Sequence, residues 1–225
     1  MATTRRFRMG QTATHPLTLP QFSSDFRRRG YAVLNDLIVP DMQTALLQEA
    51  WDQFPQGKRE IVEHSDSEDW RGGCPARRFR TVPGEQWLDS VYHSPDLRDF
   101  LRTVTGFPVE PSGQRGQYIF YCEPGDYISV HRDIESCDLV LITCLYDNRV
   151  HETGGGTLYF YPNRQDEPLS LIRQNPHHNS LGLALARGQT LLLLGGHIPH
   201  GTIPIVQGQI RLVSTLCFHV FSSHT

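Results

Sequence analysis

The sequence predicts a mainly β fold, an antiparallel sandwich or barrel of the jelly-roll type with helices packed on its outside. Three observations lead to this class. Short β-rich segments follow one another from about residue 117, turn residues (Gly, Pro and Asn) separate them, and no helical pattern comes between them. Because the helical patterns precede the strands, the helices are expected to support the outside of the barrel.

Helices are expected in three segments of the first half. The segment 39–54 (VPDMQTALLQEAWDQF) places apolar residues every three to four positions along one face. In the segment 94–106 (SPDLRDFLRTVTG), the serine suits an N-cap, the proline suits the first helical position, and the glycine suits the stop. The segment 85–92 is expected to form a shorter helix. The polar, glycine-bearing stretch 57–78 predicts a long loop, of the kind that often forms a lid.

All of these elements are expected to form one domain over residues 21–225, because 225 residues with 38% hydrophobic content suffice for a substantial core. Residues 21–116 would be the helical flank with the lid loop, and residues 117–225 the jelly-roll core. Residues 1–20 are expected to be a mobile tail. The strands are expected at 117–122, 138–146, 157–162, 169–173, 181–186, 189–194 and 210–221.

The composition excludes several classes of partner. A net charge of -3, from 21 basic and 24 acidic residues, gives no polycation to neutralise phosphates, so nucleic acid is not expected as a partner. No apolar run is long enough to span a bilayer, and the first residues lack a secretion signal. We therefore expect a cytoplasmic protein that binds a small molecule; the sequence does not indicate its oligomeric state.

The cysteines predict reduced thiols. Their number is odd and no pair has C-x-x-C spacing, so neither a disulfide framework nor a zinc ribbon is indicated. A cytosolic protein with mostly buried free thiols fits this pattern. The cysteines are Cys74, Cys122, Cys137, Cys144 and Cys217.

The segment SVHRDIE (129–135) carries the first candidate for a metal site. Alternate residues of a strand share a face, so His131 and Asp133 would present one imidazole and one carboxylate to the same ion, with Arg132 pointing away. The same H-x-D pattern at 64–66 lies in an acidic loop with no strand to fix it, and we interpret it as solvated surface. An iron site of this type needs a second histidine from a distant strand.

With the residues downstream, this pair resembles the Fe(II)/2-oxoglutarate-dependent oxygenases. That family has an H-x-D pair, a later histidine and a basic residue about ten positions further on, carried by a double-stranded β-helix, which is a cupin-like jelly roll. Here GQTLLLLGGHIPHGTIPIVQGQIR supplies His200 and Arg211 in that order. The segments YCEPGDY and TCLYDNRVHETGGGTLYFYP resemble the prolyl-hydroxylase-like branch. The likeness covers residues 117–220, about half of the chain.

The resemblance implies a metal site and a cosubstrate site. Iron(II) would be held by His131, Asp133 and His200, with His197 as the reserve choice for the third ligand. Arg211 would bind the far carboxylate of 2-oxoglutarate through two charge-assisted hydrogen bonds. The hydroxyls of Tyr121 and Thr143 would assist that carboxylate, although both are also ordinary strand residues.

The spacing departs from the family pattern in one place. Arg211 follows His200 by eleven positions (211 minus 200), where the family more often has ten, and Val213 replaces the usual serine. A bulge or a longer turn around VQGQI would absorb the extra residue, and Ser214 or Thr215 would take over the hydroxyl role.

The implied reaction is oxidative decarboxylation of 2-oxoglutarate by O2 to succinate and CO2, coupled to hydroxylation of an unactivated C–H bond of a small molecule. An amino acid or a natural-product intermediate is expected as substrate. Related halogenases carry a small residue at the carboxylate position, so Asp133 disfavours chlorination. An arginine cluster around Trp70 suits a substrate carboxylate or phosphate, unless it is only a solvated basic loop. It consists of Arg71, Arg77, Arg78 and Arg80, of which Arg78 and Arg80 are our predicted substrate contacts.

Two alternatives remain from the sequence. A cupin-like metalloenzyme could use the same three ligands for hydrolysis or isomerisation without 2-oxoglutarate, which leaves Arg211 unexplained. A non-catalytic β-sandwich binding module leaves the joint order of the two histidines, the aspartate and the arginine unexplained. Iron titration followed by 2-oxoglutarate separates the three.

Overall fold

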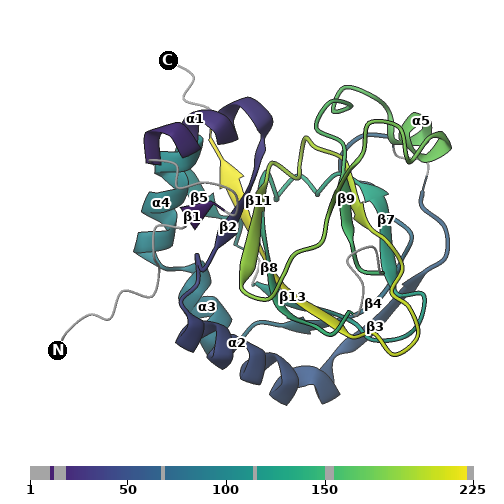
Figure 1. Cartoon of the computed structure of the whole chain (residues 1–225), viewed down its shortest axis with the longest axis horizontal. Helices are drawn as coiled ribbons and strands as arrows, with labels where there is room; N and C mark the ends of the chain where they lie inside the picture. The colour runs from purple at the N-terminus through teal and green to yellow at the C-terminus, as the bar shows by residue number, and fades with distance from the viewer. Residues whose placement is uncertain (1–10, 13–18, 67–68, 114–115, 150–154, 222–225) are drawn as a thin grey trace.

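The computed structural model describes residues 11–12, 19–66, 69–113, 116–149 and 155–221. Most of the predicted tail, residues 1–10 and 13–18, lies outside the described residues. Figure 1 shows one curled β-sheet, with most of the helices gathered on its outer side. The predicted class, a double-stranded β-helix with helices outside it, is confirmed.

Every strand pair of the sheet is antiparallel. The hydrogen-bonded order is β1-β2-β11-β8-β13-β6-β4-β7-β12-β9-β10, with β3 beside β4 and β5 beside β13. The strands are β1 (Gln11–Thr12), β2 (Tyr31–Asn35), β3 (Lys58–Val62), β4 (Arg77–Pro83), β5 (Val109–Pro111), β6 (Gln117–Tyr121), β7 (Tyr127–His131), β8 (Leu139–Asp147), β9 (Leu158–Phe160), β10 (Leu181–Leu183), β11 (Gln189–Leu193), β12 (His200–Thr202) and β13 (Arg211–Val220).

The three predicted helices are present. Helix α4 begins at Pro95 and ends before Gly106, whose φ of 79° is the left-handed conformation that glycine adopts without strain. None of the helices in the described ranges is long and apolar enough to cross a lipid bilayer. The helices are α1 (Leu19–Arg29), α2 (Pro40–Gln53), α3 (Gln86–Tyr92), α4 (Pro95–Thr105) and α5 (Leu169–Gln174), with a 3-10 turn at Phe54–Gln56.

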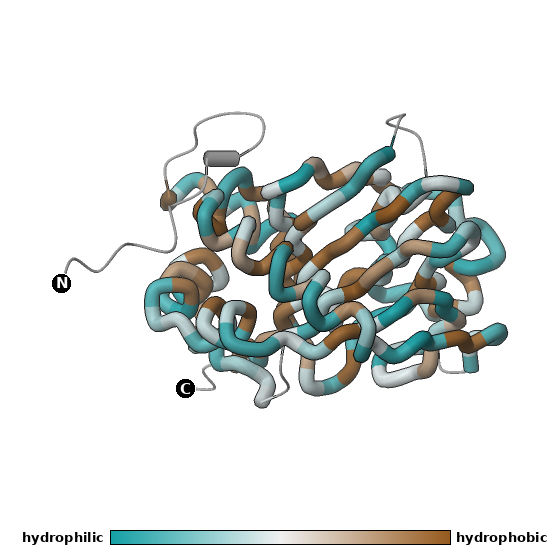
Figure 2. The backbone as a smooth tube through the Cα atoms, turned by 90° about the horizontal axis from the view of Figure 1, so that it is seen from below, coloured by the Kyte–Doolittle hydropathy of each residue, from teal (hydrophilic) through white to brown (hydrophobic). Residues whose placement is uncertain are grey.

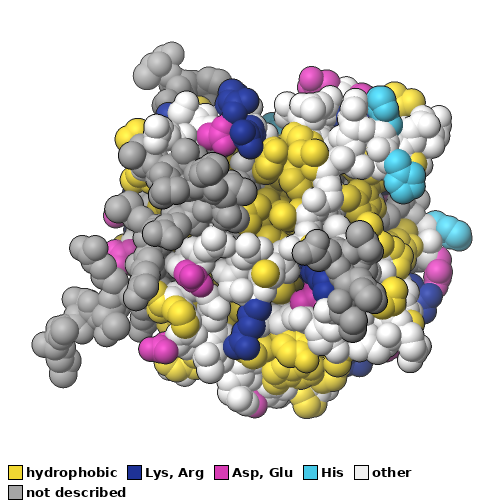
Figure 3. Space-filling model, viewed as in Figure 1, with side chains coloured by type: hydrophobic (Ala, Val, Ile, Leu, Met, Phe, Trp, Pro, Cys, Tyr) yellow, Lys and Arg dark blue, Asp and Glu magenta, His cyan; other side chains and the backbone are white. Residues whose placement is uncertain are grey.

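The sheet separates two apolar cores because neighbouring residues of a strand face opposite sides. On β8, Leu139 and Leu141 pack against the helices, whereas Val140 and Ile142 point into the barrel. Figure 2 shows hydrophobic residues recurring along the strands, while the loops at their ends are mostly hydrophilic. Figure 3 shows hydrophobic side chains gathered around the end of the barrel that faces the viewer.

Two local predictions are wrong. The stretch 57–78 is not one long loop, because it contains β3 and the first residues of β4, which join the sheet. The segment LSLIR (169–173) is not a strand but most of helix α5, which follows Pro168 and buries Leu169 and Ile172 on one side. A short apolar run does not distinguish a strand from a helix, and here the burial of residues three apart decides for the helix.

The prediction of reduced cysteines is also wrong for two of them. Cys137, in the loop after β7, and Cys217, on β13, form a disulfide with a Cα–Cα distance of 4.9 Å. Eighty positions separate them in the sequence, so no local spacing pattern reveals the pair. Cys74, Cys122 and Cys144 are free.

Candidate metal centre and its cavity

Two histidines and an aspartate meet inside the barrel. His131 ends β7 and His200 begins β12, and these residues lie opposite each other in the antiparallel pair. Asp133 follows in the loop after β7. The Nε2 atoms of both histidines lie 3.6 Å from Asp133 Oδ1. These three residues are the one group of metal-ligating side chains found within the described part of the chain, with their ligand atoms within 4.8 Å of one another.

The backbone orients both imidazoles. His131 Nδ1 lies 2.9 Å from the carbonyl oxygen of Ser129, and His200 Nδ1 lies 2.9 Å from that of Ile198. An Nδ1–H that donates to a carbonyl fixes the tautomer and leaves Nε2 as the free lone pair. Both Nε2 lone pairs then face the carboxylate of Asp133, which is the arrangement that a bound cation requires.

Asp133 fits only because residue 195 is a glycine. The Asp133 N–H donates to the Gly195 carbonyl at 2.9 Å. A Cβ on Gly195 would lie 1.9 Å from Asp133 Oδ2, so any other residue would displace the carboxylate. The role of Gly195 was not predicted from the sequence, although the pair of glycines before His197 is its visible signal.

Burial and mutual charge set the protonation of the three residues. Burial and the neighbouring His131 lower the pKa of His200 to about 4, which keeps it neutral near pH 7. Burial alone would raise the pKa of Asp133, but the influence of the neighbouring His200, His131 and Arg71 outweighs it and lowers the pKa. An ionised carboxylate beside a neutral imidazole is the state in which these groups bind a metal.

His197, the reserve ligand, lies elsewhere. Its side chain is exposed and lines a separate cavity beside Phe26 and Phe107. Its carbonyl accepts a hydrogen bond from Arg132 Nε at 3.1 Å. The geometry therefore brings His200, and not His197, to the H-x-D pair.

An inner lobe of about 170 Å³ lies on one side of the three residues. Arg211, only 1% exposed, lines it from the start of β13. Its Nε lies 3.8 Å from Asp147 Oδ2, yet Nε and Nη2 form no hydrogen bond within the described residues. Buried donors without an acceptor are costly, so the lobe is suited to an anion that accepts from this guanidinium.

Two hydroxyls line the inner lobe beside Arg211, but one of them differs from the prediction. The Tyr121 ring lies 5.5 Å from the Arg211 guanidinium carbon, and burial raises the pKa of its hydroxyl, which stays a donor. Thr202 supplies the second hydroxyl. Thr143 does not line the lobe: its hydroxyl pairs with that of Thr190 at 2.8 Å on the other face of β8. The residues that alternate with it, Ile142 and Cys144, face the barrel interior.

The extra residue between His200 and Arg211 is accommodated. A turn at residues 207–208, with Gly208 at a φ of 78°, lies within the segment where it was expected. Thr215, one of the two candidates for the missing hydroxyl, lines the cavity. Gly156 allows the close approach to Arg211, because a Cβ there would lie 2.8 Å from Arg211 Cδ.

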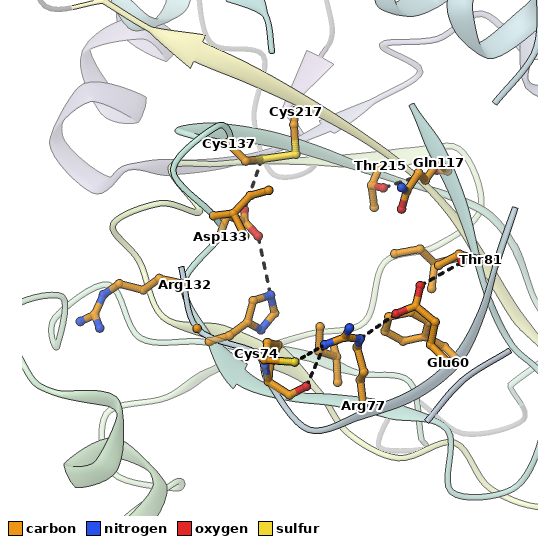
Figure 4. A pocket seen from close by; sticks show the side chains of 17 residues that line it. Glu60, Cys74, Arg77, Thr81, Gln117, Arg132, Asp133, Cys137, Thr215 and Cys217 are labelled. Atoms are coloured by element: carbon orange, nitrogen blue, oxygen red, sulfur yellow. Dashed lines mark hydrogen bonds and ion pairs between the residues drawn. A yellow bond between two sulfur atoms is a disulfide. The ribbon is translucent and has the colours of Figure 1, made fainter. Parts of the chain in front are cut away.

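An outer lobe of about 340 Å³ also adjoins the H-x-D pair. The two lobes share His131, Asp133 and part of β13. Figure 4 shows the outer lobe with Asp133 and the disulfide at one side and Glu60, Arg77 and Thr81 at the other. The wall also contains Phe79, Gln117, Ile119, Ile128 and Thr215.

The predicted substrate contacts Arg78 and Arg80 are not among the residues that line either lobe. Arg80 Nη1 donates to the Gly57 carbonyl, and its guanidinium lies over the Phe54 ring at 4.9 Å. On the same strand, Arg77 lines the outer lobe. The order of residues along a strand decides this difference, since Arg77 and Arg78 point to opposite faces.

Two further arginines attach the loop at residues 69–71 to the candidate metal centre. Arg71 donates to the carbonyl of Asp133 at 3.0 Å and to the Asp138 carboxylate at 2.8 Å. Arg132 is 5% exposed, stacks on Trp70 and donates to the carbonyls of Asp69, Gln165, Glu167 and His197. These bonds hold the loop at residues 69–71 against the backbone that carries Asp133 and the backbone that precedes His200.

Comparison with known proteins finds no matching family model and no matching curated protein. Solved structures do match. The α-ketoglutarate-dependent non-heme epimerase SnoN from nogalamycin biosynthesis superposes with a TM-score of 0.68 at 14% identity, over 89% of this chain and 82% of its own. SnoN has also been solved with Fe3+, α-ketoglutarate and nogalamycin RO.

Two more matches have the same architecture. The α-ketoglutarate-dependent carbocyclase SnoK, also from nogalamycin biosynthesis, has a TM-score of 0.66 at 14% identity, over 94% of this chain and 87% of its own. A prolyl-4-hydroxylase of Pseudomonas putida has a TM-score of 0.61 at 16% identity, over 91% of this chain and all of its own. At such identities the likeness establishes the fold, and the function has to be argued from the site.

Proposed function

We propose that this protein is an Fe(II)- and 2-oxoglutarate-dependent oxygenase that acts on a C–H bond of a small molecule. One observation carries the proposal. A two-histidine, one-carboxylate group and a buried arginine with unused donors face the same cavity, and each matches one part of the same chemistry. A metal ion bound by the triad and an anion bound by Arg211 would be neighbours in the inner lobe.

The donor set fits iron. Two imidazole nitrogens and one carboxylate oxygen on one side of a cation leave its remaining positions open, which is typical of non-haem Fe(II) oxygenases. His131, Asp133 and His200 would hold the metal. The Gly195 backbone and the carbonyls of Ser129 and Ile198 keep these ligands in position, so the site is formed before the metal arrives.

The inner lobe fits the cosubstrate. Arg211 would bind the carboxylate far from the metal, and Tyr121 and Thr202 would donate to the same group. The apolar side chains of Leu158 and Val213, which line the lobe, would exclude water and strengthen these bonds. When bound, iron and 2-oxoglutarate supply the oxidising power, through decarboxylation to succinate and CO2.

The chain's own contribution to the reaction would be positioning. The outer lobe would hold one C–H bond of the substrate beside the open side of the metal, while its wall keeps other bonds away. The matched structures include an epimerase, a carbocyclase and a prolyl hydroxylase, so the fold accommodates more than one kind of reaction. Hydroxylation is our proposed outcome, and Asp133 disfavours chlorination because it occupies the position that chloride would need.

A cupin-like hydrolase or isomerase would use the same three ligands. It gives no reason for a fully buried arginine whose Nε and Nη2 lack hydrogen-bond partners in the described residues. A non-catalytic binding module gives no reason for two imidazoles oriented toward one carboxylate. Both alternatives are therefore weaker than the oxygenase.

The test is consumption of the two cosubstrates. Protein loaded with Fe(II) under nitrogen is mixed with 2-oxoglutarate and then with air, and succinate and dissolved O2 are measured. We expect one succinate for each O2 consumed, slowly without substrate, and none with His131→Ala. A protein that binds iron but leaves 2-oxoglutarate and O2 untouched would support the cupin alternative.

A further inference from the structure

The outer lobe contains two arginines, and only one of them has a free edge toward the cavity. Arg132 uses all three of its nitrogens on backbone carbonyls: Nε on His197, Nη1 on Asp69, and Nη2 on Gln165 and Glu167. Figure 4 shows it pointing away from the centre of the cavity. Arg132 is therefore structural, and Arg77 is the arginine of this lobe that remains available to a ligand.

Arg77 is held by three partners. Its Nε donates to Glu60 Oε2 at 2.8 Å, and its Nη1 donates to the Pro75 carbonyl at 3.1 Å and lies 3.3 Å from Cys74 Sγ. Its Nη2 has no hydrogen bond to any described residue. In Figure 4 the remaining guanidinium nitrogen points into the cavity. A fixed guanidinium with one free edge binds an oxygen acceptor at little entropic cost.

Glu60 compensates the charge of Arg77. Its other oxygen, Oε1, accepts a hydrogen bond from the Thr81 hydroxyl at 3.1 Å, so the carboxylate is fixed from both sides. The side chains of Glu60 and Arg77 are each 23% exposed, which leaves both partly screened from water. An incoming anion would meet a pair of zero net charge and would lie close to the Glu60 carboxylate.

We propose that Glu60 and Arg77 together make the outer lobe selective for a substrate with a neutral oxygen acceptor, a carbonyl or a hydroxyl, on an apolar body. This inference rests on the proposed function and names the substrate class of the same site. A neutral acceptor can accept a hydrogen bond from the free Nη2 edge of Arg77 without being repelled by the Glu60 carboxylate. The body of the substrate lies along Phe79, Ile119 and Ile128, of which the two isoleucines line both lobes beside His131 and Asp133.

This inference changes the expectation drawn from the arginine cluster, which was a carboxylate or a phosphate. Arg80 contacts Gly57 and Phe54, Arg71 binds the loop after Asp133, and Arg78 lines neither lobe. Among the described residues, Arg77 is the one arginine that points into the outer lobe, and it has its own carboxylate partner. A doubly charged phosphate would need several uncompensated donors, which the described residues of this wall do not offer.

The experiment uses full-length protein loaded with Mn(II), which replaces iron without turnover, and saturating 2-oxoglutarate, which keeps anions off Arg211. The probes are benzamide and benzoate, which have the same shape and differ in charge. Affinities are read from the paramagnetic relaxation of the probe protons by the bound Mn(II). The variants are Glu60→Gln, Arg77→Met and, as matched control on the opposite face of the same strand, Arg78→Met.

In the wild type and in Arg78→Met we expect benzamide to bind about tenfold more tightly than benzoate, because both probes accept a hydrogen bond from Arg77 but only benzoate is repelled by the Glu60 carboxylate. Glu60→Gln should reverse the preference, and Arg77→Met should lose most of the affinity for benzamide while its melting temperature and its 2-oxoglutarate affinity stay unchanged. Equal or stronger binding of benzoate in the wild type overturns the proposal. So does a preference unchanged by Glu60→Gln, or the absence of relaxation for both probes while Mn(II) is bound.

The proposed function can fail separately. A protein that binds no Mn(II) contradicts the metal site and leaves the outer lobe to be measured by saturation transfer from the protein to the same two probes. The same order of affinities and the same response to Glu60→Gln are then expected, and their absence overturns the inference on its own.

Discussion

The two lobes of the cavity share His131 and Asp133 but differ in how their arginines are paired. In the inner lobe, Arg211 is fully buried, its Nε lies 3.8 Å from Asp147 Oδ2, and two of its nitrogens have no hydrogen bond to any residue that the structure describes. In the outer lobe, Arg77 is partly exposed and bonded to Glu60 at 2.8 Å. A buried cation with unused donors requires an anionic ligand of fixed shape, whereas a compensated pair at a wider opening selects against charge.

The largest expected effect separates the two candidate histidines. His200→Ala removes one of the three ligands and should abolish Fe(II) binding in calorimetry under nitrogen, because the remaining pair cannot hold the metal on one side. His197→Ala should bind iron like the wild type, since its side chain lies outside the group. Retained binding in His200→Ala together with loss in His197→Ala would show that the ligand set is different.

The next effect tests the close contact between Gly195 and Asp133, the residue of the metal site that lines both lobes together with His131. Gly195→Ala should weaken Fe(II) binding by about 100-fold, because its Cβ would take the place of Asp133 Oδ2. Gly182→Ala is the matched control, since a Cβ there meets its nearest neighbour, Thr157, at an ordinary 3.7 Å. Equal iron affinity in the two variants would mean that Asp133 can leave its position without cost.

The disulfide, which lines the outer lobe and reaches the inner lobe through Cys217, allows a third comparison. The double variant Cys137→Ser, Cys217→Ser should lower the free energy of unfolding by about 2–4 kcal/mol in denaturant titrations, because the unfolded chain loses a cross-link. Its 2-oxoglutarate affinity should be unchanged, since Arg211 is held by the two strands that flank β13. Cys74→Ser, at an exposed free thiol, is the control. Loss of 2-oxoglutarate binding in the double variant would show that the disulfide shapes the inner lobe.

A further effect concerns pH in the metal-free protein. Since the pKa of His200 is lowered from 6.5 to about 4, the unfolded chain takes up its proton first as the pH falls. Stability should therefore decrease from pH 6.5 to pH 4, by an amount of about 3 kcal/mol at 1.36 kcal/mol per pKa unit. His200→Gln should flatten the melting temperature over this range, and an unchanged slope would assign the pH dependence to other groups.

The sequence predicted those parts of the molecule that depend on hydrophobic periodicity and on the order of residue types along the chain. The helix at 94–106 has its N-cap and its glycine stop in the sequence, and the H-x-D pattern indicated that His131 and Asp133 lie together, although Asp133 lies in the loop after β7 and not on the strand. The order of His200 and Arg211 then indicated the remaining parts of the site. Each of these is a local pattern or a sequence of residue types along the chain.

The rest depends on contacts between distant strands. Gly195 matters because Asp133 approaches it closely, and Thr202 lines the inner lobe where Thr143 was expected because of which face each strand turns inward. Glu60 was assigned to a loop, so its pairing with Arg77 could not be foreseen. The disulfide could not be foreseen either, because Cys137 and Cys217 meet only where β13 packs beside the loop after β7.

We assign Arg211 to the cosubstrate and Arg77 to the substrate. The most direct test of this difference is to titrate 2-oxoglutarate into Fe(II)-loaded protein under nitrogen and to follow the visible charge-transfer band. Arg77→Met should match the wild type, because Arg77 lines only the outer lobe. Arg211→Met should weaken 2-oxoglutarate binding by about 2–5 kcal/mol, the cost of leaving a carboxylate buried without its partner, while iron affinity is kept. Weakened binding in Arg77→Met with normal binding in Arg211→Met would contradict the assignment of the two lobes.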